Sequence, residues 1–226
     1  MTIAATLLFG SLARGDHETG SDTDLLMINL DEETRYVSAG HLSLFVYPWR
    51  QLERDAQTGN LFACHLAQEA KALVDPGNYL ARLKRSFEFR ESYEDEFNRA
   101  SDLGWYLVFF GDELNSALLA KRVLWCIRTV LIARSVEQRT PTFAPQELAK
   151  RAQSQLARNL LNNRHHQHDK VCLRRALRMF LETELSPSPW SMVAEKSMFL
   201  THFVETSNKV ALQTLKQSCE CRGSYC

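Results

Sequence analysis

The sequence predicts an α+β fold in which a small sheet-containing domain is followed by an all-α helical bundle. Short apolar runs bounded by turn residues, which are typical of strands, occur only before residue 50, and long helical patterns dominate from Tyr79 onward. The charges divide in the same way. Residues 1–80 contain 11 acidic and 5 basic side chains, whereas residues 81–226 contain 16 acidic and 22 basic ones. The formal net charge of zero is therefore the sum of an acidic and a basic part.

Three runs predict strands in the first part. Residues 3–9 (Ile-Ala-Ala-Thr-Leu-Leu-Phe) and 24–30 (Asp-Leu-Leu-Met-Ile-Asn-Leu) are short and apolar, as buried strands are. A third run, residues 41–47, alternates less cleanly. It ends at Pro48, which has no N–H to donate to a central ladder, so we expect the strand to stop there.

A mostly helical segment, residues 49–72, precedes the turn signal Pro76-Gly77. We therefore predict a first domain over residues 1–77, a helical bundle over 78–218 and a flexible tail over 219–226. Glycine, proline and Asn-Asn breaks divide the bundle into five predicted helices at 79–110, 112–138, 145–161, 169–185 and 189–217. In the last of these, Ser188 is the expected N-cap and Pro189 the first helical residue.

The composition is that of an ordinary globular protein, with 45% hydrophobic and 24% charged residues among 226. No apolar run reaches the roughly 18 residues that span a bilayer, and no signal peptide is recognisable, so we expect a cytoplasmic protein without a membrane partner. Three of the six cysteines are expected to be reduced and packed as small hydrophobes: Cys64, Cys126 and Cys172. The other three lie in the tail and lack zinc-site spacing.

The stretch that indicates chemistry lies between the first two predicted strands. The first strand ends in Gly10-Ser11, and the second opens with Asp22 and Asp24. Glycine lets a backbone approach a phosphate closely, and serine presents its hydroxyl and nearby N–H groups to phosphate oxygens. Two aspartates separated by one residue on a strand point to the same face, where their carboxylates can hold one divalent metal ion.

This stretch resembles the signature of the polymerase-beta-type nucleotidyltransferases, most closely their minimal prokaryotic members. The family pattern Gly-Ser-x-Ala-Arg-Gly followed by Ser-Asp-x-Asp-Leu stands here as residues 10–15 and 21–25, at the family's spacing. The resemblance implies a mixed sheet and transfer of a nucleoside monophosphate from a nucleoside triphosphate, with ATP expected, to a hydroxyl acceptor. Magnesium ions would then stabilise the nucleophile and the leaving pyrophosphate in an in-line displacement.

The resemblance also implies roles for the matched residues. Asp22 and Asp24 are expected to be the catalytic, Mg²⁺-binding carboxylates, and Gly10 and Ser11 are expected to contact the triphosphate. For Arg14, contact with phosphate and an ion pair that fastens the turn to the sheet are both open. The acceptor, whether protein, RNA or a small molecule, is not specified by the sequence.

Two departures from the family pattern bear on activity. Family members usually carry a third carboxylate on the neighbouring strand, and here the aligned position is Ser43, a weaker ligand and a poorer base. The sequence also begins at the first strand, where the family usually has a preceding helix, so either that element is missing or the start lies upstream. A degenerate nucleotide-binding module with a regulatory or antitoxin-like role, bound to a neighbour-encoded protein, is the alternative. Whether the chain forms a homodimer is left open.

The basic part holds a second, looser pattern. Residues 150–178 contain eight basic side chains, three histidines and one acid, Asp169, and this stripe suits either a phosphate-rich ligand or the acidic domain. Within it, Arg158 and His165 are separated by six residues and resemble the active pair of HEPN domains, helical bundles that often accompany minimal nucleotidyltransferases in toxin–antitoxin pairs. That resemblance implies a further alternative, metal-independent RNA cleavage.

Overall fold

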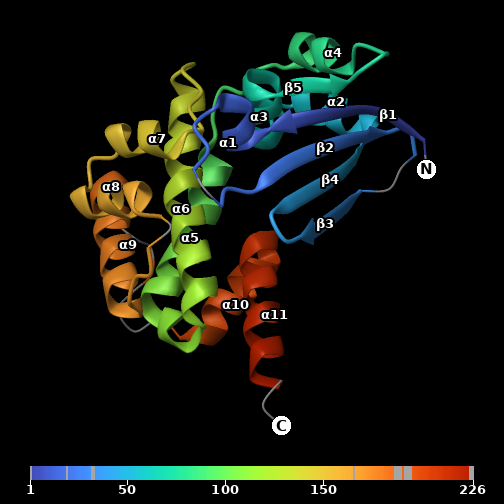
Figure 1. Cartoon of the computed structure of the whole chain (residues 1–226). Coiled ribbons are helices and arrows are strands. Elements are labelled where there is room, and N and C mark those ends of the chain that lie inside the picture. Colours follow the sequence, from blue (N-terminus) through green and yellow to red (C-terminus); the bar gives the residue numbers. More distant parts are fainter. Residues whose placement is uncertain are drawn as a thin grey trace. The chain divides into compact units, whose positions relative to one another are not determined.

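A computed structural model describes the backbone of residues 2–18, 20–31, 34–164, 166–185, 190 and 195–223, and the side chains of these residues up to 218. The fold is α+β: a mixed five-stranded sheet and a set of helices, as predicted (Figure 1). The chain forms two compact units. Unit 1 comprises residues 1–92 and 135–144, and unit 2 comprises residues 93–134 and 145–226. Unit 1 therefore extends beyond the boundary predicted after Gly77.

Unit 1 is built around the sheet. Its elements are β1 (Ile3–Phe9), α1 (Gly10–Arg14), β2 (Thr23–Asn29), β3 (Arg35–Ala39), β4 (Leu42–Pro48), α2 (Trp49–Gln57), α3 (Leu61–Glu69), β5 (Lys71–Val74) and α4 (Tyr79–Ser86). The strand order is β3-β4-β2-β1-β5, and only the β2–β4 pair is parallel. The three predicted strands are present, shifted by at most one residue, and β3 and β5 are additional.

The core of unit 1 lies on one face of the sheet. Alternate residues of β1 and β2, among them Leu7, Leu26 and Ile28, have no exposed surface. Apolar residues of α2, α3 and α4 pack on them, including Leu52, Ala56, Ala63, Leu66 and Leu83. The helical segment predicted over 49–72 is broken between α2 and α3, because Gly59 adopts φ +64° and Asn60 caps α3 by accepting from the Phe62 and Ala63 amides.

Unit 2 is helical. It contains α5 (Glu94–Phe110), the 3₁₀ turn η1 (Gly111–Glu113), most of α6 (Ser116–Glu137), α7 (Pro145–Arg151), α8 (Gln155–Asn162), α9 (Lys170–Glu184), α10 (Lys196–Glu205) and α11 (Lys209–Gly223). Three of the five predicted helices, 79–110, 145–161 and 189–217, are wrong in extent, because each is divided in two. Ser154 accepts from the Ala157 amide and opens α8, and Asn208 accepts from the Ala211 amide and opens α11. Residues 87–93 separate α4 from α5.

The cysteines differ from one another in environment. Cys64 and Cys126 are buried as predicted, and burial raises the pKa of the Cys64 thiol to about 12. Cys172 is exposed on α9, which corrects the expectation that it packs in the core. The predicted N-cap Ser188 and the side chains of the tail cysteines lie outside the described residues. In the part of the chain that is described, no helix has the length and apolarity to cross a membrane.

Candidate functional site

The register of β1 and β2 brings the two halves of the motif together. Phe9, the last residue of β1, is paired with Asp24 near the start of β2, so the Gly10-Ser11 turn begins directly beside the Asp24 carboxylate. Gly10 has φ +73°, and a Cβ atom there would lie 2.5 Å from Asp24 Oδ2. Only glycine allows this backbone to adopt that conformation and to approach the carboxylate so closely.

The carboxylates of the motif lie at the open end of the buried sheet face. Asp24 is half-buried and belongs to the same alternating set as the fully buried Leu26 and Ile28. Asp22 is more exposed, with 58% of its side chain accessible, and its Oδ1 lies 3.3 Å from His41 Nδ1. Asp24 therefore lies at the edge of the core. Asp22 precedes β2 and lies in solvent, which corrects the expectation that both aspartates belong to the strand.

The neighbouring strand presents Ser43 beside Asp24. In the parallel β2–β4 ladder, Asp24 is paired with Ser43, so their side chains stand next to each other on one face. Ser43 is only 8% exposed, and its Oγ lies 3.4 Å from the Tyr36 hydroxyl on β3. The position that the sequence alignment assigned to a third carboxylate is therefore adjacent to Asp24, and a serine occupies it.

The oxygen donors at this edge suit a hard cation. Carboxylates of Asp22 and Asp24 with the hydroxyl of Ser43 are the ligand types that Mg²⁺ prefers. Among the described residues, no group of three or more His, Cys, Asp or Glu side chains is arranged to hold a metal ion. Asp22, Asp24 and Ser43 thus offer donor atoms of the kind that magnesium takes, and Ser43 stands where the resemblance implied a third acid.

Arg14 is engaged in ion pairs within unit 1. Its Nε lies 3.1 Å from the carboxylate of Asp16, and its Nη1 lies 2.5 Å from Glu69 Oε2 on α3. Burial alone would lower the pKa of Arg14, but hydrogen bonds to Glu69 and Asp16 hold it above its ordinary value. Of the two roles considered for Arg14, the structure shows the ion pair. This pair fastens the motif turn to α3 rather than to the sheet.

Glu69 continues this network away from the turn. The same Oε2 atom lies 2.8 Å from His65 Nε2, and the His65 ring stacks on Phe143 with centroids 4.4 Å apart. Phe143 belongs to the 135–144 segment of unit 1. Sequence reasoning missed Glu69 and His65, whose only sequence signal is their i,i+4 spacing on one helix.

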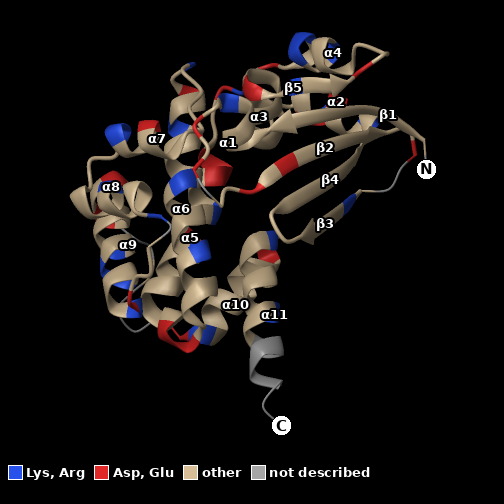
Figure 2. Cartoon of the chain, in the orientation of Figure 1, with Lys and Arg blue, Asp and Glu red and all other residues tan. Residues whose placement is uncertain are grey.

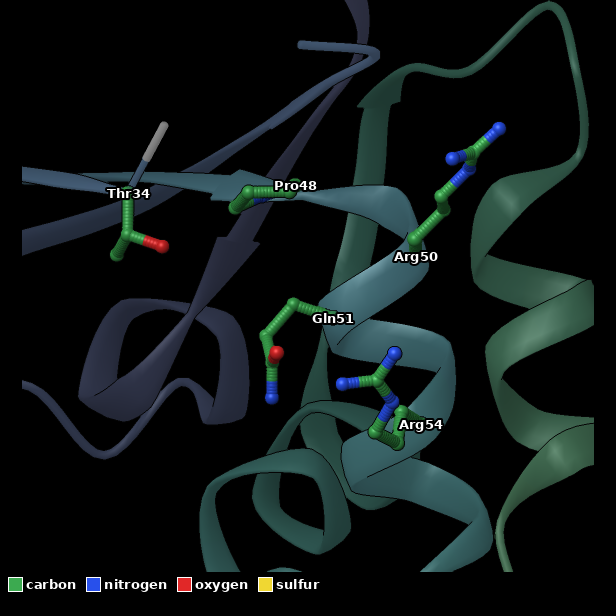
Figure 3. A pocket seen from close by; sticks show the side chains of 5 residues that line it. All are labelled: Thr34, Pro48, Arg50, Gln51 and Arg54. Carbon is green, nitrogen blue, oxygen red and sulfur yellow. The ribbon is translucent and has the colours of Figure 1, made fainter. Parts of the chain in front are cut away.

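A hollow of unit 1 lies away from the motif. It is lined by Thr34, Pro48, Arg50, Gln51 and Arg54, and Figure 3 shows Gln51 and Arg54 on the same side of α2. Pro48 ends β4 five residues after Ser43, which places the hollow roughly 16 Å along the strand from the carboxylates. It is therefore separate from the candidate site.

The residues predicted for RNA cleavage are only partly described. Arg158 Nε donates to the Ala152 carbonyl at 2.6 Å, and its Nη2 donates to the Gln153 carbonyl at 3.3 Å, so this guanidinium caps the end of α7. His165 lies outside the described residues. Another basic residue of the stripe, Arg174, similarly donates to the carbonyls of Val108 and Phe109 at the end of α5. The RNA-cleavage hypothesis stays a prediction.

Comparisons with known proteins show a distant similarity to solved structures. No protein-family model matches the sequence, and no curated protein sequence matches it significantly. Among solved structures, a nucleotidyltransferase-like protein from Exiguobacterium sibiricum 255-15 is similar over 98% of this chain and 86% of its own, with 14% sequence identity and a TM-score of 0.33. This similarity is too distant to assign an activity, which has to be argued from the residues of unit 1.

Proposed function

We propose that the protein is a nucleotidyltransferase that moves a nucleoside monophosphate from a nucleoside triphosphate to a hydroxyl acceptor. The observation that carries the proposal is the contact between the two halves of the motif, where the Gly10 backbone lies against the Asp24 carboxylate. The Gly10 backbone, which can approach phosphates, thus lies beside Asp24, one of the two carboxylates proposed to hold a divalent cation. This is the combination that transfer from a metal–triphosphate substrate requires.

Each residue has a distinct task in this proposal. Gly10 and Ser11 hold the triphosphate through backbone N–H groups and the serine hydroxyl, and Asp22 and Asp24 hold magnesium. Magnesium, when bound, neutralises charge on the triphosphate and on the departing pyrophosphate. The acceptor oxygen forms a bond to the α-phosphorus as the bond to pyrophosphate breaks. The acceptor proton leaves to water, because Ser43 is a poor base.

The test is transfer of label from each of the four α-labelled ribonucleoside triphosphates, with Mg²⁺, to protein, RNA and small-alcohol acceptors. The Asp22→Asn/Asp24→Asn double variant should lose at least about a hundredfold in rate, because metal binding contributes several kcal/mol to such reactions. Glu53→Gln on α2, which removes a charge from the same unit, should keep the wild-type rate. If wild type transfers no more label than the double variant with any acceptor, catalysis is excluded.

A second candidate function is nucleotide binding without turnover. Ser43 favours it, because this serine stands beside Asp24 where the family pattern has a carboxylate. Such a module would bind Mg²⁺–ATP in calorimetry, transfer no label, and act through a stable complex with a neighbour-encoded protein. Measurable turnover by the wild-type chain would remove this candidate.

A further inference from the structure

Unit 2 contains a pocket that the nucleotidyltransferase proposal does not use. It lies along α6, has a volume of about 400 Å³, and is lined by Lys121, Arg122, Trp125, Arg128 and Thr129 with apolar neighbours. Lys121, Trp125 and Arg128 follow one another at helical spacing and share one face of α6. Figure 2 shows basic residues recurring along this helix. The lining holds three cations and no acid, in a volume that suits a small ligand.

Arg122 is the unusual member of this lining. It is only 5% exposed, and its Nε has no hydrogen-bond partner among the described residues. Its Nη2 donates to two amide oxygens on α11, Gln213 Oε1 at 3.3 Å and Gln217 Oε1 at 3.0 Å. Burial lowers the pKa of Arg122, because it removes water from the guanidinium without supplying a carboxylate. Arg122 is therefore a buried cation held by neutral groups.

Three other shielded arginines of the protein are balanced by carboxylates. Arg14 meets Asp16 and Glu69, Arg134 meets the buried carboxylate of Glu184, and Arg174 lies 3.4 Å from Asp112. A buried charge without an opposite charge is costly, and an anion that entered the pocket would remove that cost. Within the described part of the chain, Arg122 lacks such a carboxylate, and it lines a pocket, which points to a ligand that supplies the negative charge.

The other lining residues indicate what else that ligand contains. The Trp125 indole offers an aromatic surface within reach of the three cations, and a nucleobase stacks well on such a surface while its phosphate pairs with arginine and lysine. The neighbouring Leu124 and Ile132 make much of the wall apolar, which suits a base better than inorganic phosphate alone. Phosphate and base together match the whole lining.

We propose that the α6 pocket binds a nucleoside phosphate, with the phosphate on Arg122 and the base on Trp125. The ligand can be a free mononucleotide or one nucleotide of an RNA strand, since both present the same chemistry. The site is formed by residues of unit 2 alone, so it stands or falls independently of the transferase proposal.

The test is binding of AMP and of a fluorescein-labelled RNA decamer to the full chain carrying Asp22→Asn/Asp24→Asn, without Mg²⁺, so that the unit 1 site does not contribute. Arg122→Met should weaken binding at least about tenfold, because a charge-assisted hydrogen bond is lost. Trp125→Leu should weaken it several-fold through lost stacking. Lys84→Gln on α4, which removes one exposed charge from unit 1, should leave the affinity unchanged.

The unfolding midpoint without ligand separates a ligand-binding role from a structural one. Arg122→Met should keep or raise the midpoint, because an uncompensated cation is removed and both glutamines can turn to water. Binding of AMP by wild type identifies a mononucleotide site, and binding of the decamer alone identifies an RNA site. Wild-type affinity in Arg122→Met or in Trp125→Leu, or affinity for inorganic phosphate equal to that for AMP, would overturn the proposal. If Arg122→Met does not fold, the Lys121→Gln/Arg128→Gln double variant takes its place and should likewise weaken binding at least about tenfold.

Discussion

Two shielded arginines, one in each unit, are held by different groups and have pKa values shifted in opposite directions. Arg14 in the motif turn of unit 1 is held by two carboxylates, which raise its pKa above the ordinary value. Arg122 in α6 of unit 2 is 5% exposed and is held by two amide oxygens, and burial lowers its pKa. The first charge is satisfied within the chain and serves the fold. The second is left for a ligand, and its neighbours form a pocket around it.

The largest effect is expected from Gly10→Ala, which should damage the site in unit 1 and leave the α6 pocket intact. Gly10→Ala adds a Cβ atom 2.5 Å from Asp24 Oδ2 at a residue with positive φ, so the turn and the carboxylate must separate. Label transfer should fall at least about a hundredfold, because the phosphate-binding turn and the metal ligands act in one geometry. Metal-independent AMP binding at the α6 pocket should not change.

A matched control for Gly10→Ala is Gly20→Ala. Gly20 also has positive φ, at +88°, but a Cβ atom there would meet nothing within 4 Å. It should show the modest stability loss of a strained alanine and retain transfer. Equal loss of transfer in both variants would show that backbone strain, rather than the approach to Asp24, explains the effect.

The stability of two methionine variants tests the comparison between the arginines. Arg14→Met leaves the partly buried Glu69 without its main partner and should lower the free energy of unfolding by about 2 kcal/mol. Arg122→Met should leave that free energy unchanged or raise it. Urea unfolding of both variants measures the difference, and a similar loss in both would mean that Arg122 serves the fold as Arg14 does.

A smaller effect is expected from adding the missing acid. Ser43→Asp places a carboxylate beside Asp24 in the β2–β4 ladder and should raise Mg²⁺-dependent transfer about tenfold, through a better metal ligand and base. Because Ser43 is 8% exposed, the change should also cost about 1 kcal/mol of stability. Ser43→Asn, of similar size and without charge, is the control. An equal gain in both variants would contradict a role for the carboxylate.

The smallest effect is expected at an exposed ion pair. Lys150 lies 2.7 Å from Glu147, but 72% of its side chain is accessible, so solvent screens the attraction. Lys150→Gln should change the free energy of unfolding by less than about 0.5 kcal/mol. A loss comparable to that of Arg14→Met would mean that an ion pair stabilises the fold equally whether it is exposed or shielded.

The sequence predicts the centre of the sheet better than its edges. The inner strands β1, β2 and β4 have buried apolar residues that stand out in the sequence. Every residue of β3 and β5 is exposed, so no apolar pattern marks these edge strands. The helices were predicted too long because internal caps such as Asn60, Ser154 and Asn208 act through side-chain hydrogen bonds that periodicity does not detect.

The two sites also differ in how far the sequence alone predicts them. The order of Gly10, Asp22 and Asp24 along the chain is a local pattern that is visible in the sequence. Antiparallel pairing of two strands adjacent along the chain then brings Gly10 beside Asp24. The α6 pocket depends on how far α11 covers Arg122, a contact between residues 91 and 95 positions apart. A charged residue in an apolar helix looks like a solvent-facing one until that packing is known.

The most direct test of the central claim, that Gly10, Ser11, Asp22 and Asp24 form one nucleotide site, is calorimetric binding of ATP in the Arg122→Met background, where the α6 pocket does not contribute. With Mg²⁺ present, this chain should bind ATP at least about tenfold more tightly than the same chain with Asp22→Asn/Asp24→Asn, and removal of Mg²⁺ should abolish that difference. Equal affinity of the two chains for Mg²⁺–ATP would contradict the claim.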